Sequence, residues 1–171
     1  MHKVRRLHIY LALAAALAIH LTFLNKLMIF GARPDLILIV VVFFALFRDW
    51  RMGLELGLIA GLLKDLFAFD LFGVNTLVLG VVGFSAGVMN AKLFRESRMT
   101  QFISVFALAA FSMWFHYFVI SFRSKGSYLI TLSDYLFFSV LPASIYTALV
   151  SVPIFAKFIA IYNLTDSEYF L

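Results

Sequence analysis

Long apolar runs, broken only by short polar stretches, make up almost the whole chain of 171 residues. A helix needs roughly 20 apolar residues to cross the hydrocarbon core of a bilayer, which is about 30 Å thick. Hydrophobic residues make up 64% of the chain and charged residues 13%, against about 45–50% and about 25% in soluble domains. A soluble fold of this size would lack the polar surface to cover itself. The sequence therefore predicts an all-α, polytopic membrane protein.

Six transmembrane helices fit within this length and leave no room for a sizeable soluble domain. We expect residues 1–171 to form one transmembrane domain, a compact bundle with spans at about 7–24, 34–50, 52–69, 74–94, 101–122 and 132–158. Pro34 and Asp35 are typical of a helix start, because proline is tolerated in the first turn and an acidic group is favourable there. Pro142 lies inside the last apolar run and predicts a kink.

Basic residues predict the orientation, since lysine and arginine collect on the cytoplasmic side of membrane proteins. With the N-terminus inside, the inner segments hold Lys3, Arg5, Arg6, Arg48, Arg51, Lys92, Arg95, Arg98 and Lys157. The outer segments hold only Lys26, Arg33, Arg123 and Lys125. We therefore expect both termini in the cytoplasm. The net charge of +5 is interpreted as topology and not as a nucleic-acid surface.

Small residues at regular spacing predict close helix packing in the third and fourth spans. The third span carries glycines four residues apart, at Gly53, Gly57 and Gly61. These glycines share one helix face, and Asp65 is the next position along it. The fourth span carries a second set, Gly80, Gly83 and Gly87. Such faces let a second helix approach closely, and we favour packing within the bundle over a docking groove for a partner helix.

Polar residues at the outer ends of the second to fourth spans predict a small polar cluster. An acidic side chain at bilayer depth is costly, so Asp65 needs a partner, as a structural staple or as a functional site. We expect the cluster to consist of Arg33, Pro34, Asp35, Asp65 and Asn75. Lys64 points about 100° away from Asp65 on a helix, so we expect it to extend outward instead.

A further acidic residue, Glu55, lies in the third span, one turn after Arg51. This spacing predicts an ion pair between the two side chains on one helix face.

No catalytic, cofactor-binding or metal-binding set is recognisable in the sequence. The chain has no cysteine, and His8, His20 and His116 lie on widely separated stretches. The serines lack a histidine and aspartate constellation, and no glycine-rich phosphate loop is present. We therefore expect a protein that is not an enzyme and holds no cofactor or metal.

Three motifs follow one another between residues 33 and 95. Arg33-Pro34-Asp35 opens an apolar span, Gly53–Leu66 carries glycines and an aspartate at four-residue spacing, and Phe72-Gly73-Val74-Asn75 precedes a glycine-bearing span. In this order they resemble the MreD family of bacterial rod shape-determining membrane proteins. Lys64 departs from the family pattern, in which apolar or amide residues are commoner beside the aspartate.

The resemblance implies a non-enzymatic role in cell shape, in the bacterial inner membrane. MreD-like proteins act with the bitopic protein MreC, indirectly with the actin-like MreB filament, and with RodA and a class B penicillin-binding protein. The chain would then be a scaffold that binds MreC and supports lateral peptidoglycan synthesis. Membrane lipids are expected partners, a homo-oligomer is left open, and nucleic acid is not expected.

The alternative is a substrate-binding membrane subunit of an energy-coupling-factor transporter for vitamins or micronutrients. Such subunits are also six-span proteins with both ends inside, and the bundle predicted here is similar to theirs. They dock a membrane partner through alanines four residues apart on the first helix, and residues 12–18 offer such a face. A shared fold would be analogy alone. This alternative predicts a closed outward pocket lined by converging aromatic and polar side chains.

Overall fold

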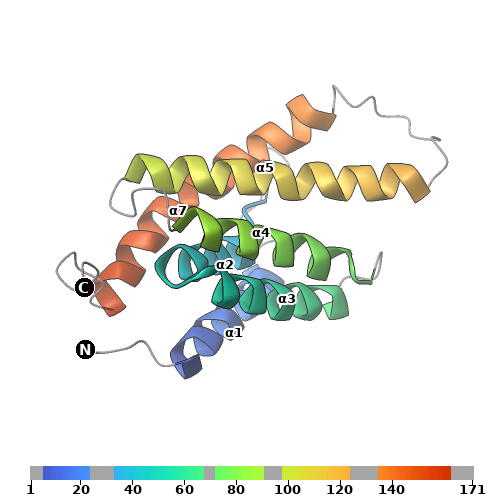
Figure 1. Cartoon of the computed structure of the whole chain (residues 1–171). Coiled ribbons are helices and arrows are strands. Elements are labelled where there is room, and N and C mark those ends of the chain that lie inside the picture. The colour runs from blue at the N-terminus through green and yellow to red at the C-terminus, as the bar shows by residue number, and fades with distance from the viewer. Residues whose placement is uncertain (1–5, 24–32, 68–71, 91–97, 124–134, 163–171) are drawn as a thin grey trace.

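The computed structural model describes residues 6–23, 33–67, 72–90, 98–123 and 135–162, and its regular structure there is entirely helical. The helices are α1 (Arg6–Phe23), α2 (Leu36–Phe47), α3 (Trp50–Phe67), α4 (Val74–Asn90), α5 (Arg98–Arg123) and α7 (Leu141–Tyr162). A π-helical turn, η1 (Leu136–Val140), leads directly into α7. The all-α prediction is confirmed for these residues (Figure 1).

The helix α2 forms the centre of the bundle. Every residue from Ile37 to Leu46 is buried, and α2 contacts α1, α3, α4, α5 and α7. A helix that is apolar on all sides needs an apolar environment all round, and here neighbouring helices supply it. Twelve residues rise only about 18 Å, less than the ~30 Å hydrocarbon core. Because protein encloses α2, its length need not match the bilayer.

The outer helices present apolar side chains away from the bundle. The segments Arg98–Val119 and Leu136–Tyr162 are long and apolar enough to cross a membrane, whereas three further apolar helices are shorter. Phe122 is 83% exposed and Phe138 is 79% exposed. Exposed apolar surface on this scale is typical of a protein that meets lipid. The number of spans and the orientation of the termini remain predictions.

Helix boundaries differ from the predicted spans at several places; α5, for example, begins at Arg98 and not at residue 101. The helix α2 ends at Phe47, and Trp50 begins α3 instead of ending the second span. The cause is local: the Asp49 carboxylate accepts a hydrogen bond from the Met52 backbone N–H at 2.7 Å and caps the start of α3. At the other end of the chain, α7 continues to Tyr162, beyond the predicted limit at residue 158.

A π-helical turn, η1, lies just before Pro142, where we expect a kink, and the kink itself stays a prediction. Proline has no backbone N–H, and its ring clashes with the carbonyl four residues earlier, which here is that of Phe138. That carbonyl lies within η1, whose wider turn gives the ring space. Tyr135 immediately precedes this turn, and its side chain lines a cavity in the bundle.

Candidate functional site

The glycine faces of α3 and α4 pack directly against each other. A Cβ atom added to Gly57 would overlap the carbonyl of Leu79, and one added to Gly61 would overlap the backbone of Thr76. The facing backbone pairs along this antiparallel contact are Gly53–Gly83, Gly57–Leu79 and Gly61–Thr76. This contact is the most extensive between any two described helices. These glycines therefore lie inside the bundle, and their faces are not open to a partner helix.

The remaining glycines of the hairpin formed by α3, α4 and the turn between them have different roles. Gly87 packs against the backbone of Trp50 at the start of α3 and against the carbonyl of Asp49 just before it. Gly80 faces only the side chains of α3, and the nearest is the tip of Leu58. Gly73 precedes α4 with a φ of 96°, a left-handed conformation that favours glycine.

Asp65 clamps the end of α3 onto the start of α4. Its Oδ1 accepts hydrogen bonds from the Asn75 backbone N–H at 3.0 Å and from Asn75 Nδ2 at 2.9 Å. Its Oδ2 accepts from the Thr76 backbone N–H at 2.9 Å and from Thr76 Oγ1 at 2.6 Å. The side chain is 1% exposed, so four hydrogen bonds replace its lost water. An anion at the start of a helix also matches the helix dipole, so Asp65 acts as a structural staple.

Asp35 and Lys64 form a separate ion pair. Asp35 caps α2, because its Oδ1 accepts a hydrogen bond from the Leu38 backbone N–H at 3.1 Å. Its Oδ2 lies 2.6 Å from Lys64 Nζ, and both side chains are about one-fifth exposed. The Asp35 backbone N–H donates to Thr147 Oγ1 at 3.2 Å and joins α2 to α7. The expectation that Lys64 extends outward was wrong, since it turns inward to the start of α2.

The structure thus divides the predicted polar cluster into two groups. One group lies at the Asp35–Lys64 ion pair and consists of Arg33, Pro34 and Asp35. The other group lies at the turn between α3 and α4 and consists of Asp65 and Asn75. Among the described residues, Arg33 forms no ion pair with Asp65. The sequence did not indicate Thr76, whose hydroxyl and backbone supply half of the hydrogen bonds to Asp65.

The expected pairing of Glu55 with Arg51 was also wrong. Glu55 accepts a hydrogen bond from the Tyr10 hydroxyl at 2.5 Å, which ties α1 to α3. The Arg51 guanidinium lies instead over the ring of Trp50, 5.3 Å from its centroid.

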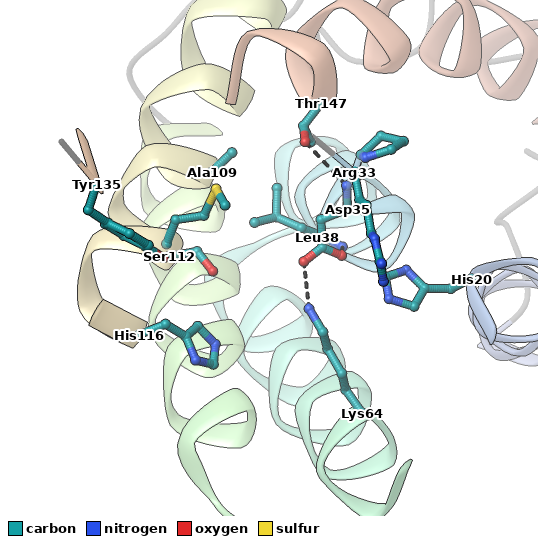
Figure 2. Close-up of a pocket in the computed structure, with 12 residues that line it drawn as sticks. His20, Arg33, Asp35, Leu38, Lys64, Ala109, Ser112, His116, Tyr135 and Thr147 are labelled. Atoms are coloured by element: carbon teal, nitrogen blue, oxygen red, sulfur yellow. Dashed lines mark hydrogen bonds and ion pairs between the residues drawn. The ribbon is translucent and has the colours of Figure 1, made fainter. Parts of the chain in front are cut away.

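A cavity of about 470 Å³ opens at the end of the bundle where the Asp35–Lys64 pair lies. Side chains from α1, the start of α2, α3, α5, the start of η1 and α7 surround it (Figure 2). The polar lining consists of His20, Arg33, Asp35, Lys64, Ser112, His116, Tyr135 and Thr147. The apolar lining consists of Pro34, Leu38, Ala109 and Met113. The orientation predicted from the basic residues would place this end of the bundle at the outer face of the membrane, and it stays a prediction.

Several lining residues were not predicted as members of a site. His20 and His116 seemed unrelated in the sequence, yet the packing of α1 and α5 around α2 brings both to this cavity. The Nδ1 atom of His20 is buried and has no hydrogen-bond partner among the described residues. No group of three or more metal-ligating side chains was found in the part of the chain that the structure describes.

Comparison with known proteins adds one match. A family model described as rod shape-determining protein MreD matches residues 3–165, far beyond the 33–95 region that carries the sequence motifs. No curated protein and no solved structure matches the chain. The expected similarity to the energy-coupling-factor subunits therefore has no support from a solved structure.

Proposed function

The chain belongs to the MreD family of rod shape-determining proteins, and on this premise we propose that it is a membrane scaffold of the cell-elongation machinery. Family membership indicates a membrane protein with a role in rod shape. The proposal adds that the chain binds MreC and thereby supports lateral peptidoglycan synthesis by RodA and a class B penicillin-binding protein, with MreB linked indirectly. The observation that carries it is the family match over residues 3–165.

A scaffold needs a rigid body, and the contacts of α2, α3 and α4 supply one. The glycine faces bring the backbones of α3 and α4 into direct contact, too close even for an added Cβ atom at Gly53, Gly57 or Gly61. The four hydrogen bonds to Asp65 fix the end of α3 to the start of α4. Because these faces are used internally, we place the contact with a partner helix elsewhere on the bundle.

The helix α1 offers an outward face suited to such a contact. It lies at the edge of the bundle, and its main contact is with α2 (Figure 1). Ala14, Ala15 and Ala18 are exposed on it, beside Leu11 at 58% exposure. Small side chains on an exposed face let a second transmembrane helix approach closely. We assign this face to the transmembrane helix of MreC.

Depletion of the chain in its own bacterium tests the function, and two alanine variants test the docking face. Depleted cells should widen and lose rod shape, and the wild-type chain should restore it. Ala14→Phe should fail to restore it, because the added ring holds a partner helix away from α1. Ala107→Phe places the same ring on an exposed position of α5 and should restore rod shape.

Immunoblots of the membrane fraction must show equal amounts of both variants. Depleted cells that remain rods would contradict the proposed function. Equal rescue by Ala14→Phe and Ala107→Phe would contradict only the placement on α1.

One observation favours the transporter alternative, namely the cavity at the predicted outer face. It has converging polar side chains, as a ligand-binding subunit requires, although Tyr135 is the only phenyl-type ring among the described residues that line it. A transporter subunit of this class would also need a coupling protein and ATPases as partners, which the elongation scaffold does not. Identification of the partners therefore separates the two functions.

A further inference from the structure

The charges around the cavity do not balance. Arg33 and Lys64 are cations and Asp35 is an anion, which leaves a net charge of +1 among the lining residues when the histidines are neutral. The Asp35 carboxylate is already engaged by Lys64 and by the Leu38 N–H. Arg33 is exposed and has no ion pair among the described residues. The cation that lacks a counterion is therefore the one at the mouth of the cavity.

Hydrogen-bond donors also outnumber acceptors in this cavity. A lysine ammonium has three donors and an arginine guanidinium has five, whereas Lys64 uses one donor on Asp35. The Ser112 and Tyr135 hydroxyls and the rings of His20 and His116 line the same space (Figure 2). A ligand rich in acceptor oxygens and carrying negative charge matches this lining. A phosphate group has both properties, and arginine binds it in a bidentate manner.

We propose that the cavity between Arg33, Lys64 and His116 binds the phosphate group of an anionic membrane amphiphile. Its volume, about 470 Å³, lies within the range of small-ligand sites, roughly 300–1,000 Å³. Leu38, Ala109 and Met113 provide apolar surface beside the polar groups. The phosphate lies between Arg33 and Lys64, and the adjoining glycerol or chain lies along these apolar side chains.

The surroundings of the cavity favour an amphiphile over a free anion. Tyr135 lines the cavity, and the next turn of the same helix exposes Phe137 at 66% and Phe138 at 79%. These rings point away from the bundle, where acyl chains of a bilayer would contact them. A molecule with its phosphate in the cavity could therefore keep its chains beside η1. The shared chemistry is the phosphate, and a lipid headgroup and inorganic phosphate are its two possible sources.

Native mass spectrometry of the purified full-length chain in detergent tests this site. The probes are phosphatidylglycerol, phosphatidylcholine with the same acyl chains, and inorganic phosphate. We expect one phosphatidylglycerol to be retained per chain in preference to phosphatidylcholine, whose choline cation offsets the negative charge of its phosphate. Arg33→Gln should weaken that binding about tenfold, the usual scale for loss of a charged hydrogen bond.

Two further variants separate a built site from general attraction to basic protein. Arg98→Gln removes an exposed arginine at the start of α5, about 27 Å along the helix from His116, and should leave binding unchanged. Ala109→Phe keeps every charge but fills the cavity from a position that is 3% exposed, and should abolish the retained lipid. Thermal unfolding of the lipid-free variants verifies that each one is folded.

Each outcome of these binding experiments either supports the proposal or overturns it. Competition by inorganic phosphate supports a site that recognises phosphate from either source, and retained lipid without such competition supports the headgroup as the source. Equal binding of the two lipids, equal losses in Arg33→Gln and Arg98→Gln, or unchanged binding in folded Ala109→Phe would overturn the proposal. The proposal is independent of the elongation function, so failure of one leaves the other standing.

Discussion

Replacing Gly57 by alanine is the most direct perturbation of the α3–α4 hairpin. The added Cβ would lie 2.7 Å from the Leu79 carbonyl carbon and 3.0 Å from the Gly80 Cα, and closer still to the Leu79 carbonyl oxygen. Ordinary van der Waals contact begins at 3.4 Å. The two helices must therefore separate locally by at least 3.4 − 2.7, or 0.7 Å. All the atoms that block the methyl group belong to backbone, which no rotamer change can move.

The expected cost follows from two opposing effects. Overpacking costs about 1–3 kcal/mol, and a rigid backbone obstacle places Gly57→Ala at the upper end of this range. Alanine stabilises a helix interior by about 1 kcal/mol relative to glycine. The net loss in the free energy of unfolding is then about 2 kcal/mol. For a chain of this length the melting temperature should fall by about 4–8 °C.

Gly80→Ala is the matched control on the facing helix. Its Cβ would lie 2.9 Å from Leu58 Cδ2, the mobile end of a side chain, so repacking is easy. The gain in helix propensity offsets the remaining cost, and we expect the melting temperature to stay within about 3 °C of the wild type. Thermal unfolding of both variants in the same detergent measures the difference. A Gly57→Ala protein as stable as Gly80→Ala would refute the reasoning about backbone contact.

Two further predictions concern Asp65 and the Asp35–Lys64 ion pair. Asp65→Asn should lower the free energy of unfolding by about 2–3 kcal/mol, because an amide cannot accept hydrogen bonds from all four donors. The control, Asp49→Asn in an exposed helix cap, should change the free energy of unfolding little. Equal thermal shifts in the two variants would count against a stabilising role of the Asp65 hydrogen bonds. Lys64→Gln should destabilise the chain by leaving Asp35 unpaired, and the double variant Asp35→Asn/Lys64→Gln should recover about 1–2 kcal/mol relative to the sum of the single changes. If the loss of stability in the double variant equals the sum of the losses in the two single variants, Asp35 and Lys64 are not coupled.

Features that depend on local spacing could be predicted from the sequence. The four-residue interval of Gly53, Gly57 and Gly61 places them on one helix face in any α-helix, and the same interval puts Asp65 at the end of that face. The structure brings this face onto α4 and brings Asp65 to Asn75, one of its expected partners. The apolar run of α2 also indicates its position in the bundle. It has no polar face, and this is typical of a helix that other helices enclose.

Features that depend on which helices meet could not be predicted. Asp35 and Lys64 lie 29 residues apart, and no periodicity relates the start of α2 to the end of α3. The cavity collects His20 from α1 and His116 from α5, and only the packing of both helices around α2 brings them together. Spacing along one helix defines a face, but the partner of that face is decided by the bundle.

Affinity purification of the tagged chain from its native membrane, with mass spectrometry of the recovered proteins, tests the central claim most directly. We expect to recover MreC, together with RodA and the class B penicillin-binding protein. An untagged membrane processed in parallel gives the background. Recovery of a transporter coupling subunit with its ATPases, and no enrichment of MreC over that background, would contradict the scaffold function.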